Sequence, residues 1–270
     1  MTDELYQEPG INKPLIGVAI AVVIAAAAGG YYWYGRTQQA KPPQVEEPVA
    51  ASPAPAEARI EHPVPADVGS TPLPDLNDSD KAIGDALGQA VGQDAVASYL
   101  VRDGIIRHIV VTVDNLPRQK LPVDKRPIVP VPGTFAAVGD ELHATLDSRN
   151  FRRYSPMIDV LRRLDMQRLA AVYFRFYPLL QKSYEDLGYP NGYFNDRLVN
   201  VIDDLLKTPQ IAGPIELARP NVLYVFADQS LESRSAGQKL LLRMGPDNAA
   251  VVKAKLAELR SIVTAAPPKH

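Results

Sequence analysis

Hydrophobic positions recur every three or four residues through most of the chain after Asp75, which is the spacing of the buried face of an α-helix. Capping residues, glycines and prolines at the ends of these stretches predict where the helices begin and end. The predicted helices lie at 78–91, 93–101, 103–113, from Ser155 onward, and at 167–187, 194–206, 228–244 and 246–263. The branched residues from Ile105 to Val113 also suit a strand, so both interpretations stay open there.

Two predicted helices contain a proline, which marks the start of one helix and a kink in the other. Ser155 followed by Pro156 is typical of a capping serine with proline at the first helical position. The longest predicted helix, 167–187, has an apolar face that begins at Leu169. It also contains Pro178, which predicts a kink because proline lacks the N–H that the helix needs.

Acidic residues mark the starts of the first helices. Asp78, Ser79 or Asp80 suits the N-terminal cap of the helix that ends near residue 91, and Asp103 suits the cap of the helix over 103–113. We interpret the spacing of Asp78 and Asp80 as helix capping rather than as a catalytic or metal-binding pair.

Two shorter segments have the alternation and turn residues of β-hairpins. Residues 134–146 predict a hairpin that turns at Gly139-Asp140, and residues 215–227 predict a second that turns at 219–221. Five prolines from Pro117 to Pro132 predict an extended surface loop. The predicted fold class is therefore mainly α (α+β), a compact multi-helix domain with two short β-hairpins.

The N-terminal region follows a different pattern. Residues 14–34 contain no charge and end in the aromatic cluster 31–34. About 20 apolar residues span the hydrocarbon core of a bilayer as a helix, and aromatic rings favour the headgroup layer. We predict a single-pass transmembrane helix at 14–34. A cleaved signal peptide is the alternative, since 25–28 is a run of alanines, but the acidic tail 1–13 argues against it.

A proline- and alanine-rich stretch follows at 35–74, with almost no large apolar residues. Such a stretch cannot bury enough apolar surface to offset its conformational entropy, so it predicts a disordered, extended spacer. A ligand for a proline-recognition domain is the alternative, although no PxxP cluster with flanking basic residues stands out. The predicted division of the chain is a tail at 1–13, the span at 14–34, the spacer at 35–74, the helical domain at 75–264 and a disordered tail at 265–270.

Composition narrows the classes of function. The chain has 270 residues, 29 Lys+Arg against 31 Asp+Glu and a formal net charge of −2, so it lacks the basic excess of a general nucleic-acid binder. With no cysteine it has no disulfide framework, zinc ribbon, thiol nucleophile or iron–sulfur cluster. The sequence contains no HExxH, GxSxG or Walker motif, and its four histidines are scattered. No metal or cofactor is predicted.

Arginines are concentrated between residues 149 and 175. The candidate binding residues are Arg149, Arg152, Arg153, Arg162 and Arg163. Arginine forks match phosphates and carboxylates, so this stretch predicts contact with an anionic envelope protein, lipid or polysaccharide. The favoured alternative is intramolecular, because the acidic stretch 185–204 that follows could pack against the arginines and neutralise them.

A second candidate site is a pocket that contains aromatic and acidic residues. Its members are Tyr189, Tyr193, Asp196, Asp228 and Glu232. Hydrolases of glycans use two facing carboxylates, which is the chemistry this set would supply. The simpler interpretation is that Asp228 caps a helix and that Asp196 pairs with Arg197 or a later basic residue.

Several segments together resemble a bacterial family, the domain of unknown function 3014. They are VDNLP (113–117), NFRRY (150–154), PLLQKSYEDLGYPNGYFNDRLVNVIDDLLKTP (178–209), VLYVFADQSLE (222–232) and GQKLLLRMG (237–245). The resemblance covers roughly 73–260 and implies the same layout of membrane span, spacer and helical domain. It implies no activity, cofactor or catalytic residue. Gln229 departs from the family pattern, in which proline is expected after FAD.

Together these observations predict a non-enzymatic, single-pass membrane protein that presents a helical interaction domain in the cell envelope. The alternative is an envelope hydrolase that uses the carboxylates near Asp196, Asp228 and Glu232. Basic residues flanking the span are nearly balanced and do not fix its orientation. We expect a periplasmic domain anchored in a bacterial inner membrane, because a short tail before one span is the usual signal-anchor arrangement; a cytoplasmic domain is the alternative.

Overall fold

The computed structural model describes residues 60–65, 72–140 and 143–265. The predicted tail at 1–13, span at 14–34 and the spacer up to residue 59 lie outside these residues. Within the described ranges, none of the helices combines the length and the hydropathy needed to cross a membrane.

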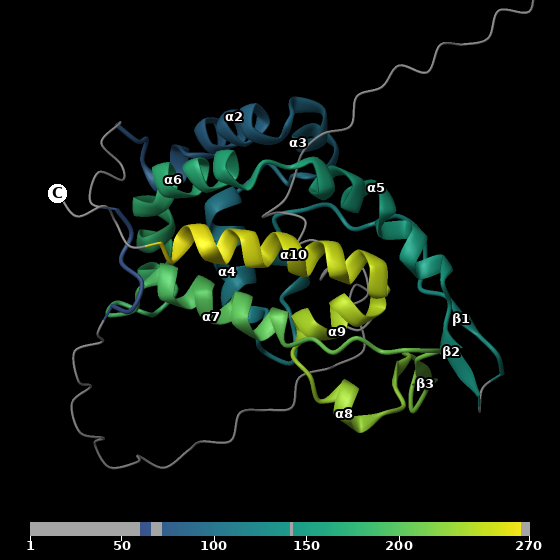
Figure 1. Ribbon diagram of the computed structural model, residues 1–270. Coiled ribbons are helices and arrows are strands. Elements are labelled where there is room, and N and C mark those ends of the chain that lie inside the picture. Colours follow the sequence, from purple (N-terminus) through teal and green to yellow (C-terminus); the bar gives the residue numbers. More distant parts are fainter. Residues whose placement is uncertain (1–59, 66–71, 141–142, 266–270) are drawn as a thin grey trace, which may run out of the picture.

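Helices make up most of the described residues (Figure 1). They are α2 (Asp80–Val91), α3 (Gln93–Tyr99), α4 (Ile105–Asn115), α5 (Arg149–Arg163), α6 (Met166–Asp186), α7 (Phe194–Leu206), α8 (Gln229–Glu232), α9 (Ala236–Arg243) and α10 (Pro246–Val263), with single 3₁₀ turns η2 (Leu76–Asp78) and η3 (Val123–Lys125). The segment after Gly104 is a helix, so the strand interpretation of this stretch is wrong.

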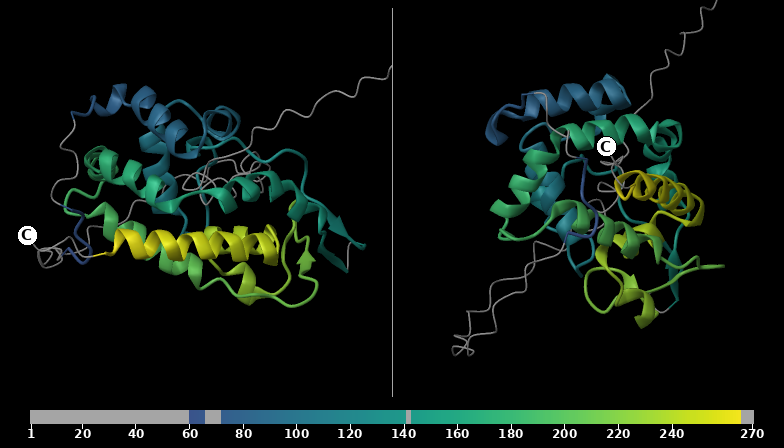
Figure 2. Two further views of the ribbon diagram at one scale, coloured as in Figure 1. Left: turned by 45° about the horizontal axis from the view of Figure 1, so that its top comes forward. Right: turned by 60° about the vertical axis from the view of Figure 1, so that its left-hand side comes forward.

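The long helix α6 forms the centre of the helical body, where it packs against α2, α4, α7 and α10. Phe176 of α6 and Phe194 of α7 are among the largest fully buried side chains. Helix α10 packs along α5 and α7, and Figure 2 shows α10 and α7 side by side in both views. The apolar face predicted for α6 is therefore the one that builds the core, because it meets neighbours on several sides.

The start predicted for α5 at Ser155-Pro156 is wrong. The helix begins at Arg149, and Pro156 lies inside it. Tyr154 is buried before the proline and shares one face with Ile158 and Leu161, at spacings of four and seven residues. Burial of this continuous face outweighs the backbone hydrogen bond that the proline removes.

Both predicted hairpins are present, and the structure joins them into one sheet. Strands β1 (Ala137–Val138), β2 (Ala144–Leu146), β3 (Glu216–Ala218) and β4 (Val225–Phe226) pair antiparallel in the order β1-β2-β3-β4. The hairpins meet through Ala144 of β2 opposite Leu217 of β3. Leu217 and Phe226 face a second apolar cluster that includes Leu231 and Leu242. The sheet thus stands at one end of the helical body (Figure 1).

Two further predictions need correction. The proline-rich loop at 117–132 does not lie wholly on the surface, because Leu121, Ile128 and Val131 are buried and Val129 N–H donates to the Tyr99 carbonyl at 2.9 Å. The helix predicted over 228–244 is two helices, α8 and α9. The second starts at Ala236 because N–H groups there donate to carbonyls after α4 rather than continuing α8.

The predicted caps of the first helices are also revised. Asp103 does not cap α4; the carboxylate of Asp80 accepts hydrogen bonds from Gly104 N–H and Ile105 N–H, both at 2.8 Å. Helix α2 itself has Ser79 at the N-cap position, as one of the three candidates, but without a side-chain hydrogen bond; the carboxylate of Asp80 instead caps a helix whose first residue is 25 positions away in sequence.

Candidate functional site

The start of α7 gathers the polar residues that the sequence singles out around residues 189–197. Three consecutive residues of its first turn, Asn195, Asp196 and Arg197, project about 100° apart around the helix axis. Each therefore meets a different part of the domain. Tyr193, just before the helix, and Tyr189, in the preceding turn, complete the site.

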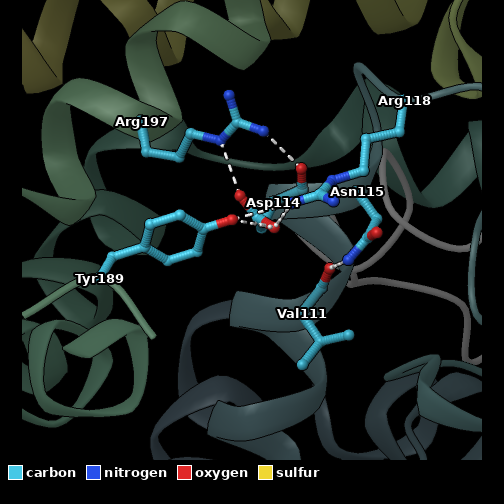
Figure 3. Close-up of polar contacts among 6 residues, drawn as sticks. All are labelled: Val111, Asp114, Asn115, Arg118, Tyr189 and Arg197. Atoms are coloured by element: carbon cyan, nitrogen blue, oxygen red, sulfur yellow. Dashed lines mark hydrogen bonds and ion pairs between the residues drawn. The ribbon is translucent and has the colours of Figure 1, made fainter. Parts of the chain in front are cut away.

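Arg197 faces the end of α4 and holds the buried carboxylate of Asp114 (Figure 3). Its Nε donates to Asp114 Oδ1 at 3.0 Å, and its Nη2 donates to the Asp114 backbone carbonyl. The Asp114 side chain is 4% exposed and that of Arg197 is 26% exposed. This pair fastens the end of α4 to the beginning of α7.

The second oxygen of Asp114 is shared by two more donors (Figure 3). Arg118 Nη2 donates to Asp114 Oδ2 at 2.6 Å and to the Tyr189 hydroxyl at 2.8 Å, and that hydroxyl donates to Oδ2 at 3.3 Å. The charge of Asp114 raises the pKa of the Arg118 guanidinium. Both oxygens of the buried carboxylate therefore accept hydrogen bonds, and a fully satisfied buried network of this kind rigidifies the contact between α4 and α7.

Asp196 faces away from Arg197 and holds a segment that precedes the domain. Its two oxygens accept hydrogen bonds from Glu61 N–H at 3.0 Å and from His62 N–H at 2.7 Å. The Tyr193 hydroxyl accepts a third, from Val64 N–H, at 2.9 Å. The expected pairing of Asp196 with Arg197 is therefore wrong, because the two side chains lie on different faces of the first turn.

Asn195 lies beneath this segment and is fully buried. Its amide nitrogen donates to the His62 carbonyl at 2.8 Å and to the Val263 carbonyl at the end of α10 at 3.0 Å. Its amide oxygen accepts from the Tyr173 hydroxyl at 2.8 Å. Burial raises the pKa of the Tyr173 hydroxyl well above its ordinary value, so it remains a donor.

The predicted spacer at 35–74 is thus not uniformly free of the domain. Residues 60–65 lie against the start of α7 and the end of α10 (Figure 1, dark blue). Val64 packs on the main core. Composition alone could not reveal this, because the segment is held mainly through its backbone, which every sequence carries.

Asp228 and Glu232 of the predicted pocket lie elsewhere, at α8 beside the sheet. Asp228 caps α8 by accepting from Ser230 N–H at 2.7 Å, and hydrogen bonds from Ser230 hold the pKa of Asp228 below its ordinary value. Glu232 accepts from Phe226 N–H at 3.0 Å and from Lys239 Nζ at 2.9 Å. Each candidate carboxylate thus has its own structural partners, and no contact among the described residues joins these two to Asp196.

The candidate arginines lie on α5, mostly on the side opposite its buried face. Arg149 pairs with Asp147 at 2.6 Å, and Arg153 donates to the carbonyls of Pro132 and Gly133. Arg163 Nε donates to the Asp159 carbonyl at 3.1 Å within its own helix.

The two remaining candidates, Arg152 and Arg162, are exposed, and within the described ranges neither forms an ion pair.

The acidic stretch at 185–204 does not neutralise these arginines in the described part of the chain. Asp203 pairs with Arg260 of α10 at 2.6 Å, which lowers the pKa of the Asp203 carboxyl. Asp204 accepts from the Ser235 hydroxyl at 2.7 Å, and Asp196 holds residues 61–62. The intramolecular alternative fails because each of these acids meets a nearer partner that tertiary packing supplies.

Among the described residues, no group of three or more His, Asp or Glu side chains is arranged to hold a metal ion. His108 is half-buried on α4, and burial lowers its pKa and favours the neutral ring.

Asp114, Asn195 and Arg197 were not among the sequence-predicted site residues. A signal for them existed, because all three fall within the segments 113–117 and 178–209 that carry the family resemblance. Nothing in those segments alone pairs one with another. Only the packing of α4 against α7 brings Asp114 to Arg197.

The fold and these contacts define a mainly helical domain with a small antiparallel sheet and a polar centre at the start of α7. Residues 105–260 match the family described as "Protein of unknown function (DUF3014)", and the chain belongs to this family. Neither the curated proteins nor the solved structures contain a match to the chain.

Proposed function

We propose that this chain is a membrane-tethered, non-enzymatic interaction protein whose helical domain binds an acidic protein surface through the exposed arginines of α5. One observation carries the proposal: Arg152 and Arg162 are exposed and form no ion pair in the described ranges, while Asp203 and Asp204 of the acidic stretch are engaged elsewhere and Asp147, which feels the charge of Arg152, is already paired with Arg149. Exposed guanidinium groups without an ion pair can form charge-assisted hydrogen bonds with carboxylates on another molecule.

The number of arginines favours a protein over a lipid surface. Recognition of anionic membranes typically uses clusters of about four to eight basic residues, each worth about 1 kcal/mol near the surface. On α5 the charge of Arg149 is already paired, and Asp159 lies on the exposed side with Arg163. The planar guanidinium groups of a few arginines bind a few fixed carboxylates on a protein better than they bind a diffuse layer of lipid headgroups.

The envelope-hydrolase alternative receives no comparable support. It requires two carboxylates that converge on one space with free oxygens. Asp196, Asp228 and Glu232 instead hold a backbone segment, cap a helix and bind a lysine. The membrane tether rests on the sequence of residues 14–34 and on the spacer that follows.

The binding surface is tested with the full-length chain in detergent-solubilised membranes. The double charge reversal R152E/R162E should reduce recovery of a bound acidic protein by more than about tenfold, because like charges then face the partner. The matched control K81E/K182E reverses two exposed lysines on other helices and should leave recovery unchanged. Equal recovery by both variants refutes the α5 surface. Arginine-dependent binding to phosphatidylglycerol vesicles, with no protein bound, refutes an acidic protein as the partner.

The side of the membrane is tested separately. Alkaline phosphatase fused after His270 is active only when exported, whereas a fluorescent protein that folds only in the cytoplasm reports the opposite topology. We expect an active phosphatase fusion. A fluorescent fusion with an inactive phosphatase would place the domain in the cytoplasm.

A further inference from the structure

We propose that the surface formed by Tyr193, Asn195 and Asp196 is a binding site for peptide backbone that bends at two successive N–H donors, and that residues 60–65 are its intramolecular ligand. An external segment that adopts the same bend and presents the same arrangement of N–H groups would bind by displacing them. This inference concerns α7 and does not depend on the arginines of α5.

The site matches the hydrogen-bonding groups of the bound segment one by one. The N–H groups of Glu61, His62 and Val64 meet three acceptor oxygens, two on Asp196 and one on the Tyr193 hydroxyl. Two of these bonds are charge-assisted, which makes them stronger than neutral ones. The site therefore recognises main chain, which bends at Glu61 and His62 so that two successive N–H groups face one carboxylate.

The prolines of the segment fit this arrangement. Pro63 and Pro65 have no N–H, and they alternate with Val64, whose N–H is used. Proline also restricts its own φ, which lowers the entropy lost on binding. The spacing of donors thus defines a ligand class: two residues with N–H groups, a proline, one apolar residue and a second proline.

Side chains of the segment differ in their burial, and His62 and Pro65 are half-buried. Glu61 and Pro63 are exposed, whereas Val64 packs against the main core. The ligand class therefore needs an apolar residue at the position of Val64 and tolerates variation at the position of Glu61. This combination of backbone contacts and a single apolar anchor is typical of a peptide site rather than of a core strand.

The domain positions this surface through contacts that do not involve the segment. Asn195 is held by the Tyr173 hydroxyl and by the Val263 carbonyl. The ring of Tyr193 lies 5.6 Å from the ring of Tyr177, centroid to centroid. Asp196 lies in the first turn of α7, whose register is fixed by the buried residues of that helix. The acceptors should therefore keep their places when the segment leaves.

Because the ligand is part of the same chain, it competes at a high effective concentration, on the order of 1 mM for short flexible connections. An external peptide should therefore bind the natural chain weakly and bind a chain without this segment more tightly. Displacement would also free six residues of tether, about 19 Å at the polyproline II rise of 3.1 Å per residue.

The test uses the full-length chain and a fluorescent peptide with the sequence of residues 58–67. In one variant, residues 60–65 are replaced by Gly-Ser repeats of the same length. Fluorescence anisotropy should give an affinity at least about tenfold higher for this variant than for the natural chain. Adding D196N should remove the gain, whereas D186N, at an exposed acid on α6, should not.

Two controls separate backbone recognition from adventitious binding. The same peptide N-methylated at the His62 amide lacks one donor and should bind at least about tenfold more weakly. Hydrogen exchange of the natural chain should show protected amides at Glu61, His62 and Val64, and D196N should release the first two. This second measurement decides the matter if the Gly-Ser variant fails to fold.

Three results would overturn the proposal: no peptide binding to the Gly-Ser variant at about 1 mM, equal binding to that variant and the natural chain, or equal binding of the methylated peptide. Exchange at residues 61–62 that is insensitive to D196N would overturn it as well.

Discussion

The most direct test of the polar centre is the substitution D114N, which keeps the shape of the side chain and removes its charge. Asp114 is almost completely buried, and Arg197, 26% exposed, loses its counter-charge when the carboxylate becomes an amide. The amide nitrogen also places a donor where Arg118 and Tyr189 now donate. The substitution therefore weakens three hydrogen bonds to one charged group at once.

The magnitude follows from the exposure of each partner. Losing the buried contact with Arg197 should cost about 2 kcal/mol, in the range for hydrogen bonds to charged groups. The contact with the Tyr189 hydroxyl adds about 1 kcal/mol, while Arg118, whose side chain is 52% exposed, adds about 0.5 kcal/mol because solvent screens it. The total, about 3.5 kcal/mol, corresponds to a fall in Tm of roughly 7–14 °C for a domain of this size.

Thermal unfolding of the full-length chain in a mild detergent, followed by circular dichroism at 222 nm, measures this shift. The matched control is D85N, since Asp85 pairs with Lys81 at 2.6 Å but both side chains are mostly exposed, at 56% and 88%. We expect no measurable change in Tm for D85N. A Tm for D114N within about 2 °C of the natural chain would refute the reasoning that this carboxylate stabilises the contact between α4 and α7.

Three further predictions concern single positions in the described domain. G237A should lower stability by about 1–3 kcal/mol, because a Cβ there would collide with Leu205, whereas G84A should raise it by about 0.5–1 kcal/mol, since the helix interior has room. D80A should cost about 1–2 kcal/mol by removing the cap of α4. The pKa of Asp203 is lowered by its arginine partner, so its contribution is present above the unfolded-state pKa and is lost as pH falls below about 4.

Urea unfolding at pH 7 measures the glycine and capping variants, and D78A serves as the control for D80A because Asp78 is an exposed acid at the end of η2, two residues before Asp80. Equal midpoints for G237A and G84A would contradict the packing argument, and equal loss in D78A and D80A would contradict the cap. For Asp203, the urea midpoint of D203N should fall less between pH 6 and pH 3 than that of the natural chain. Parallel curves would show that this carboxyl does not contribute to the acid sensitivity.

Local signals in the sequence were sufficient for several elements. Helix α7 has the predicted bounds, because its apolar period and the following Pro209 act over a few residues. The hairpin turn at Gly139 is also local, since this residue has a φ of 108° and a Cβ there would collide with the backbone of His143. Each of these features is decided by residues that are neighbours in the chain.

Membership of the family could also be predicted from the sequence, because the segments that resemble the family are long and distinctive. The match of residues 105–260 to the family confirms this prediction. The candidate site could be predicted from the sequence only in part. Tyr193 and Asp196 hold the same segment at the start of α7, but Tyr189 binds Asp114 and Arg118 instead, and Asp228 and Glu232 lie at α8. Residue type and spacing identify polar groups, yet they do not tell a cap or an ion-pair partner from a binding residue.

The sequence by itself therefore determined the helical class, the two hairpins and the family, since periodicity, turns and caps act over short stretches. The tertiary structure alone decided that α5 continues through Pro156, that Asp80 caps α4 and that Asp196 holds residues 61–62. The last of these contacts joins groups 135 and 134 residues apart. Such partners are chosen by which faces the packed helices bring together, and a buried polar group binds whichever complementary group that packing places within reach.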